Sequence, residues 1–183
     1  MELILASKSP RRQELLKLFG LPFTVRVADI DETMEHDDPA EAVALLSRKK
    51  AAAARETDDQ VVIGADTIVV LDGKILGKPA DEADAFRMLS ALSGRRHQVM
   101  TGVTVLQGDR FVSVTEITEV TFRSLTEQEI RRYIATGDPM DKAGSYGIQS
   151  GGALFVEGIC GDYYNVVGLP VCRLGQILKE FML

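Results

Sequence analysis

Two arginines stand at an unusual place near the start of this sequence. Arg11 and Arg12 follow Ser9 and Pro10, residue types that favour the N-cap and the first position of a helix. Cations are disfavoured in the first turn of a helix, because the exposed N–H groups there carry partial positive charge. An anion bound at that helix end would reverse the cost, and arginine offers a fork of donors for phosphate oxygens. The segment Ser7 to Arg12 therefore fits a phosphate site, and it fits equally well a simple cap with two solvated arginines.

Asp66 is a carboxylate inside an otherwise apolar segment, between Ile63 and Ile68. Burying a carboxylate is costly unless it is paired, hydrogen-bonded or bound to a metal. Its neighbours Gly64 and Ala65 are small, which would leave room for a ligand. We interpret Asp66 as a functional residue; the alternative is an aspartate that makes a turn at the end of a strand.

Three further charged residues are weaker candidates on their own. Glu32 lies in an acidic loop, where carboxylate oxygens would suit a hard cation such as magnesium, although most acidic loops are simply solvated. Lys50 follows Lys49 on a predicted helix, and Lys78 stands between a glycine and a proline. Neither lysine indicates a site by itself.

Short strands and helices alternate along the chain with no obvious linker between them. Hydrophobic periodicity and turn residues predict strands at 3–5, 23–27, 61–71, 74–76, 99–106 and 111–122, and helices at 10–19, 39–55, 81–92, 127–136 and 170–181. Asp38 and Thr126 are expected to begin capping boxes, and Asp72-Gly73 predicts a hairpin turn. The glycine-rich stretch 143–161 predicts turns. This order indicates a single mixed α/β or α+β domain over residues 1–183, of a kind that can form two lobes around a cleft.

Composition excludes several functional classes. The net charge of -6 argues against binding along a nucleic-acid polymer, which usually needs a basic face. It does not argue against a small phosphorylated ligand, for which a few local cations suffice. The N-terminus shows no signal peptide, and no apolar run approaches the roughly 18 residues that a membrane span needs. We therefore expect a cytoplasmic protein that does not bind a membrane.

The cysteines and histidines do not form a metal-binding pattern. Cys160 and Cys172 are far apart from His36 and His97, so a zinc site is not indicated. Both cysteines are expected to be reduced and to lie in or near the core. Walker and dinucleotide-binding glycine motifs are also missing from the sequence.

Taken together, these residues resemble the Maf nucleotide pyrophosphatases, a family once named for inhibition of septum formation. The resemblance begins with Leu5-Ala6-Ser7-Lys8-Ser9-Pro10-Arg11-Arg12. It continues in order through Asp31-Glu32, Arg48-Lys49-Lys50-Ala51, Gly64-Ala65-Asp66-Thr67, Gly77-Lys78-Pro79, Ala143-Gly144-Ser145-Tyr146-Gly147-Ile148-Gln149 and Tyr164-Asn165-Val166-Val167-Gly168-Leu169-Pro170. Each motif is short, but the ordered set covers essentially the whole chain and is highly specific.

The resemblance implies a fold like that of the inosine-triphosphate pyrophosphatases, with a mixed sheet flanked by helices and two lobes around a central cleft. It implies hydrolysis of a nucleoside triphosphate to a monophosphate and pyrophosphate, with a divalent cation, most readily Mg²⁺ or Mn²⁺. The implied phosphate-binding residues are Ser7, Arg11, Arg12, Lys50 and Lys78. Glu32 and Asp66 would bind the metal. Asp66, Glu32 and Lys78 would be the catalytic residues, with Asp66 accepting the proton of the attacking water.

The resemblance also suggests a substrate. In the subgroup most like this chain, Arg12, Thr67 and Gln149 are implied as specificity positions, with dTTP and UTP as substrates. Gln149 can both donate and accept hydrogen bonds, which suits the edge of a pyrimidine. A second subgroup, which prefers 7-methyl-GTP, remains an alternative. The family further implies a homodimer and a role in clearing modified nucleotides, linked by analogy to division arrest.

Two hypotheses from other classes remain open. The chain could be a nucleotide-binding regulator of septum formation without catalysis, or a nucleic-acid-binding protein. The first predicts dispensable carboxylates, whereas Glu32 and Asp66 are both kept here together with Lys50 and Lys78. The acidic net charge weakens the second.

Overall fold

The computed structural model describes residues 2–182, which divide into two compact units. Unit 1 contains the described residues up to Thr67, the segment Thr101–Glu116 and the residues from Tyr164 onward. Unit 2 contains Ile68–Met100 and Ile117–Tyr163. The chain passes between the units several times, mostly within strands.

Unit 1 holds β1 (Leu3–Ala6), α1 (Pro10–Lys17), β2 (Thr24–Val25), α2 (Pro39–Ala54) and α6 (Val171–Met182). Unit 2 holds β4 (Lys74–Leu76), α3 (Glu82–Leu92), α4 (Glu127–Ile134), β7 (Val156–Cys160) and the 3-10 turns η1 (Asp138–Asp141), η2 (Ala143–Ser145) and η3 (Gly151–Leu154). The remaining elements contribute residues to both units: β3 (Val61–Leu71), β5 (Arg96–Gln107), β6 (Arg110–Phe122) and α5 (Tyr163–Val167).

The strands hydrogen-bond in the order β2-β1-β3-β5-β6-β7, and β4 pairs with β3. β1 is parallel to β2 and β3, whereas β4 and β7 are antiparallel to their partners. The expected mixed α/β class, with a mixed sheet flanked by helices, is therefore confirmed. The expected cleft stays a prediction.

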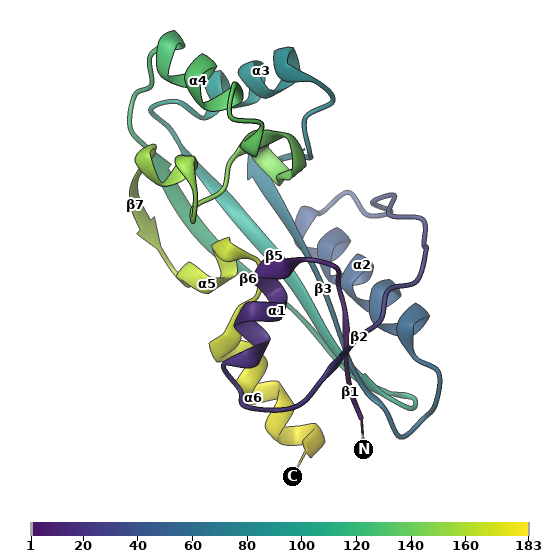
Figure 1. The fold of residues 1–183 in the computed structure, drawn as a ribbon. Coiled ribbons are helices and arrows are strands. Elements are labelled where there is room, and N and C mark those ends of the chain that lie inside the picture. The colour runs from purple at the N-terminus through teal and green to yellow at the C-terminus, as the bar shows by residue number, and fades with distance from the viewer. Residues whose placement is uncertain (1, 183) are drawn as a thin grey trace. The chain divides into compact units, whose positions relative to one another are not determined.

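In unit 1 the strands lie between two helical layers. α2 packs directly on β3 and β5, because a Cβ built on Gly64 would lie 2.1 Å from the carbonyl oxygen of Ser47, and one on Gly102 would lie 2.3 Å from that of Val43. α1 and α6 lie on the opposite side of these strands (Figure 1). Gly175 of α6 faces the ring of Phe19, which follows α1.

In unit 2, α3 and α4 pack against each other (Figure 1). The ring of Phe122 lies edge-on to His97, Tyr146 and Phe155, with ring centroids 4.7–5.9 Å apart. Edge-on aromatic packing of this kind is favourable beyond the area that it buries. It forms the aromatic part of the core of unit 2.

Most predicted elements are present, and their end signals act as expected. Ser9 caps α1, and Thr126 and Glu129 form the predicted reciprocal capping box of α4. Asp38 caps α2 by accepting from the N–H of Ala40, and its own N–H donates to His36 Nδ1, so the predicted capping box with Glu41 does not form. Asp72 and Gly73 form the predicted hairpin turn, both with positive φ.

Expectations about one strand, the glycine-rich stretch and the cysteines were wrong. The predicted strand at 23–27 shrinks to Thr24–Val25, whose side chains are both exposed, so no burial favours a longer strand. The glycine-rich stretch contains a strand, β7, which the sequence did not predict. Cys160 and Cys172 are free thiols as expected, but both are exposed rather than in the core, because they lie on the solvent sides of β7 and α6.

Candidate active site

Arg12 lies at the start of α1 and donates hydrogen bonds in three directions. Its Nε donates to the carbonyl oxygen of Gly168 at 2.7 Å. Its Nη1 donates to Ser7 Oγ at 3.2 Å, and its Nη2 donates to Thr67 Oγ1 at 2.9 Å. One side chain thus joins the loop after β1, the middle of β3 and the segment before α6, all in unit 1.

The surroundings of Arg12 act on its pKa in both directions, and the net effect lowers it. Burial lowers the pKa of the guanidinium, while the nearby carboxylate of Asp66 raises it. The half-buried Arg11 lowers the pKa of Arg12 further. Arginine stays protonated in proteins, so Arg12 remains a half-buried cation close to the carboxylate of Asp66.

Ser7 is buried, and its oxygen accepts two hydrogen bonds. The N–H of Ser9 donates to Ser7 Oγ at 3.3 Å, and Arg12 donates to the same atom. Because both bonds use the oxygen as acceptor, the hydroxyl proton of Ser7 can be donated to an anion. The predicted cap is Ser9, whose side chain accepts from the N–H of Arg12, so the cap is confirmed. Phosphate binding by the same segment stays a prediction.

The ammonium group of Lys50 forms ion pairs with both of the predicted metal-binding carboxylates. Its Nζ lies 2.6 Å from Asp66 Oδ1 and 3.0 Å from Glu32 Oε1. The side chains of Lys50 and Asp66 are each only 15% exposed, whereas that of Glu32 is 62% exposed. The acidic loop that carries Glu32 is also tied to α2 by a second ion pair, between Glu35 and Lys49 at 2.5 Å.

The alternation of β3 separates these two groups of contacts. Successive side chains of a strand face opposite sides of the sheet. Gly64 and Asp66 face α2, where Lys50 lies, while Thr67 faces α1, where Arg12 lies. Two neighbouring residues of one strand thus carry a carboxylate site and an arginine site on opposite faces.

The carboxylate pair fits a divalent cation. Within residues 2–182, no group of three or more histidine, cysteine, aspartate or glutamate side chains gathers as a set of ligands. Magnesium, however, commonly binds through one or two carboxylates and completes its shell with water and substrate phosphates. Glu32 and Asp66 already share one positive centre, the ammonium of Lys50, and oxygen is the donor atom that such a cation prefers.

The other two predicted site residues, Lys78 and Gln149, belong to unit 2 and are both exposed. The structure brings their two segments together: the N–H of Gly144 donates to the carbonyl oxygen of Gly77 at 3.1 Å. A Cβ on Gly144 would collide with Val69, so the packing of this segment on β3 requires glycine. Of the predicted site residues, Lys78 and Gln149 thus belong to unit 2 and the others to unit 1.

Thr101 is a residue of the site that the sequence did not indicate. Its hydroxyl donates to the carbonyl oxygen of Asn165 at 3.0 Å and lies 2.9 Å from Thr67 Oγ1. A hydroxyl has one proton, so Thr67 must donate to Thr101 while accepting from Arg12. Thr67 is therefore left with a lone pair only. A single threonine in an alternating strand gives no sequence signal for this role.

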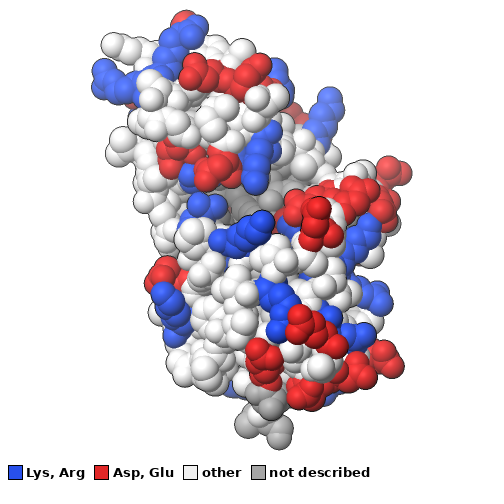
Figure 2. Space-filling model, turned by 45° about the vertical axis from the view of Figure 1, so that its right-hand side comes forward, with Lys and Arg blue, Asp and Glu red and all other residues white. Residues whose placement is uncertain are grey.

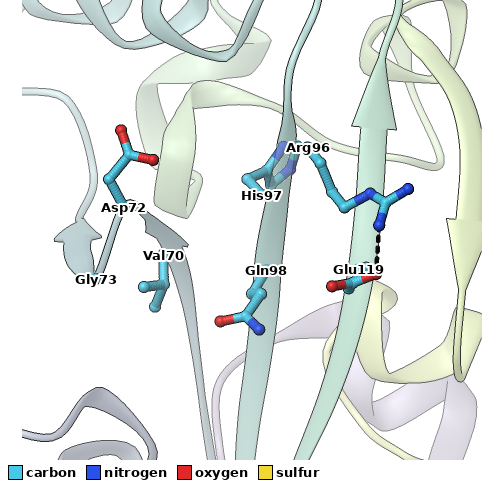
Figure 3. Close-up of a pocket in the computed structure, with 7 residues that line it drawn as sticks. All are labelled: Val70, Asp72, Gly73, Arg96, His97, Gln98 and Glu119. Carbon is cyan, nitrogen blue, oxygen red and sulfur yellow. Dashed lines mark hydrogen bonds and ion pairs between the residues drawn. The ribbon is translucent and has the colours of Figure 1, made fainter.

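A separate hollow in unit 2 contains none of the predicted site residues. It is lined by the hairpin residue Asp72 and by Arg96, Gln98 and Glu119, among others (Figure 3). Arg96 and Glu119 form an ion pair at 3.2 Å across neighbouring strands. His97 turns to the buried side, where its Nε2 lies 2.8 Å from the hydroxyl of Tyr146. The hollow does not support a second active site.

Comparisons with known proteins identify relatives of this chain. The family model described as "Maf-like protein" matches residues 2–181. A dTTP/UTP pyrophosphatase of Bacillus cytotoxicus is 54% identical over 180 residues, which are 97% of this chain and 94% of the relative. A protein of the same name from Bacillus cereus is 52% identical over 182 residues, covering 98% and 95% of the two chains.

Two solved structures share the fold at low sequence identity. The Ham1 protein of Staphylococcus aureus superposes with a TM-score of 0.55 at 16% identity, and covers 98% of both chains. The HAM1 protein of Coxiella burnetii gives a TM-score of 0.53 at 17% identity, covering 98% of this chain and 99% of its own. These likenesses confirm the expected fold. With a family model that spans nearly every residue and relatives above 50% identity, the chain belongs to the Maf family.

Proposed function

We propose that this chain is a nucleoside triphosphate pyrophosphatase that hydrolyses dTTP and UTP to the nucleoside monophosphate and pyrophosphate. The observation that carries the proposal is the convergence of Glu32 and Asp66 on one cation, Lys50 Nζ, in the unit that also holds Arg12 and Ser7. Acidic and basic groups in this combination suit an anionic substrate that must also be attacked by water. The names of the Bacillus relatives support the same activity.

Cationic and hydroxyl groups of the chain would bind the triphosphate. Ser7, Arg11, Arg12, Lys50 and Lys78 are the proposed phosphate-binding residues, and Lys78 also assists catalysis. Ser7 contributes the hydroxyl proton that its two acceptor bonds leave available. Arg12 is held in place by its three hydrogen bonds, so little conformational entropy is lost when it meets an anion.

Asp66 is the proposed proton acceptor. In the reaction, the oxygen of water forms a bond to the α-phosphorus, the bond to the leaving pyrophosphate breaks, and Asp66 takes the proton of the water. Asp66 is held by Lys50 at 2.6 Å, which fixes its orientation before the substrate arrives. A positioned carboxylate base of this kind commonly contributes a rate factor of about 10² to 10⁴.

Glu32 and Asp66 are the proposed ligands of a divalent cation, Mg²⁺ or Mn²⁺. When bound, such a cation neutralises phosphate charge and makes water more acidic. Lys50 already gathers the two carboxylates and keeps them from repelling each other.

Arg12, Thr67 and Gln149 are the proposed specificity residues. The hydrogen bonds of Thr67 leave it able only to accept from a ligand, which complements the N3–H that uracil and thymine share. Gln149 offers both a donor and an acceptor on an exposed side chain. A 7-methyl-GTP pyrophosphatase is the alternative within the family.

The two non-enzymatic hypotheses have less support. A regulator that only binds nucleotide has no need for Glu32 and Asp66 to converge on Lys50. On the face drawn in Figure 2, basic side chains are interspersed with acidic ones rather than gathered into one basic surface. Such a mixture does not favour binding along a nucleic-acid backbone.

The setting of the enzyme is also a proposal. Within the described part of the chain, no helix has both the length and the apolar character to cross a bilayer. We propose that the enzyme is a cytoplasmic homodimer and that residues 1–183 act as a single domain. We also propose that it clears modified nucleotides.

The proposed activity is tested with purified protein, dTTP, UTP, CTP or 7-methyl-GTP, and Mg²⁺ or Mn²⁺. We expect dTTP and UTP to yield monophosphate and pyrophosphate, with ¹⁸O from labelled water in the monophosphate.

Asp66→Asn is expected to lower kcat about 10² to 10⁴-fold, because the proton acceptor is lost. Asp72→Asn is the matched control, since Asp72 is an exposed hairpin residue, and it should retain full turnover. Diphosphate as product, or an active Asp66→Asn enzyme, would contradict the proposal.

A further inference from the structure

The turn that carries Gln149 is held in place by a network of polar side chains in unit 2. Asp138, at the start of η1, is its centre. Its carboxylate accepts hydrogen bonds from Tyr133 Oη, from Ser150 Oγ at 2.5 Å and from Lys142 Nζ at 2.8 Å. Tyr133 Oη in turn accepts a hydrogen bond from the backbone N–H of Gly147 at 3.1 Å. Both ends of the turn from Gly147 to Ser150 are therefore tied to one carboxylate.

The ionisation of these groups keeps the network in one arrangement. Burial alone would raise the pKa of Asp138, but the hydrogen bonds from Lys142, Ser150 and Tyr133 lower it below its usual value. Burial and the hydrogen bond to Asp138 raise the pKa of Tyr133 to about 12. At neutral pH Asp138 is thus an acceptor and Tyr133 a donor, as the network requires.

Close packing leaves the turn little freedom. A Cβ built on Gly147 would lie 2.6 Å from both Lys142 Cε and Ser150 Oγ. The backbone of the turn therefore rests directly on members of the network. Gln149, between the two anchored ends, is exposed.

We propose that Tyr133, Asp138 and Ser150 are positioning residues that fix the Gly147–Ser150 turn and so present Gln149 to the base of the substrate. The proposal rests on the proposed function, in which Gln149 contacts the base. Hydrogen bonds weaken steeply when distance or angle departs from the optimum, so a flexible glutamine side chain reads a base well only if its backbone is fixed. The network supplies that fixed backbone.

The experiment measures kcat and KM for dTTP in a double-mutant cycle of Ser150→Ala and Gln149→Ala. If Ser150 acts through Gln149, we expect Ser150→Ala to raise KM about five-fold with little change in kcat. In the Gln149→Ala background the same change should alter KM less than about two-fold. Ser150→Thr keeps the hydroxyl and should therefore have the wild-type KM. Tyr133→Phe should raise KM as Ser150→Ala does. Ser124→Ala, at another exposed serine of unit 2, should leave KM unchanged.

Two results would overturn the inference while leaving the proposed function intact. One is an unchanged KM in both Ser150→Ala and Tyr133→Phe. The other is an equal loss with and without Gln149, which would mean that the network acts on something else. Absence of dTTP turnover by the wild-type protein would contradict the proposed function itself, and is distinguished from both.

Discussion

Arg12 uses the geometry of its side chain as well as its charge. Its three hydrogen bonds, to Gly168, Ser7 and Thr67, spread in the plane of the guanidinium and join parts of unit 1 that are distant in sequence. A lysine ammonium is a compact charge on a flexible stem and cannot reach three acceptors in this arrangement. The remaining N–H groups of Arg12 are those that would meet the phosphate in the proposed function.

Arg12→Lys is therefore expected to be harmful although it conserves charge. We expect kcat/KM for dTTP to fall at least about ten-fold and the free energy of unfolding to fall by about 1–3 kcal/mol, because buried acceptors lose their donors. Steady-state kinetics and urea unfolding measure the two effects. Arg11→Lys is the matched control for stability and should change the free energy of unfolding by less than about 0.5 kcal/mol. Equal effects of the two substitutions on stability would show that the three hydrogen bonds contribute little.

The sequence could indicate Arg12 but not its partners. Two arginines in a first helical turn break a local rule, and that conflict is visible in the sequence. The carbonyl oxygen of Gly168 is 156 positions away and the hydroxyl of Thr67 is 55 positions away, and only the fold brings them to Arg12. The same holds for Thr101, whose role depends on the direction of one hydrogen bond.

At the scale of elements, Gly64 and Gly102 allow the backbone of α2 to come into direct contact with β3 and β5. Gly64 was interpreted from the sequence as leaving room for a ligand beside Asp66. Instead, the space is filled by the backbone of α2, since a Cβ on Gly64 would lie 2.1 Å from Ser47 O and 2.8 Å from the nitrogen of Ala51. This close approach is what brings Lys50 of α2 to Asp66 of β3.

Gly64→Ala is expected to push α2 away from β3 and to lower both stability and activity. Backbone atoms cannot move aside as a flexible side chain can, so we expect a loss of about 3 kcal/mol in the free energy of unfolding. Turnover of dTTP should also fall, because Lys50 moves with the helix. Chemical unfolding and kinetics give the two numbers.

Gly158→Ala in β7 is the control, because nothing lies within 4 Å of a Cβ at that position. It should leave stability and turnover within error of the wild type. If Gly64→Ala were as harmless as Gly158→Ala, α2 would not be held at backbone contact with β3.

Elements with strong local signals were predictable, and those formed by tertiary pairing were not. Residues adjacent in the sequence are enough to predict the caps of α1 and α4 and the Asp72-Gly73 hairpin. β7 is not, because its five residues include a glycine and lack alternation, and it forms only by pairing with β6. The network around Asp138 was missed for a similar reason, since its members become neighbours only when the glycine-rich stretch folds back on α4.

At the scale of the whole molecule, the two units share covalently continuous strands. β3, β5 and β6 each contribute residues to both units, so we expect unfolding of one unit to disturb strand structure in the other. His97 is a sensitive probe of this coupling because it is buried in unit 2, beside Phe122 and Tyr146. Its burial lowers the pKa of the imidazole from 6.5 to about 4.

His97 should make the chain less stable in mild acid. As pH falls below 6.5, the unfolded chain binds a proton at His97 while the folded chain does not, until pH nears 4. The unfolded state thus binds more protons in this window, and the free energy of unfolding falls as pH falls, by about 2 kcal/mol between pH 7 and pH 5.

Because the strands are shared, we expect amides of β1 in unit 1 and of α4 in unit 2 to lose the same protection, as measured by hydrogen exchange. In His97→Gln this part of the loss should disappear in both units, whereas His36→Gln, at an exposed histidine, should behave as the wild type. Acid-dependent loss confined to α4 would mean that the two units unfold independently despite their shared strands.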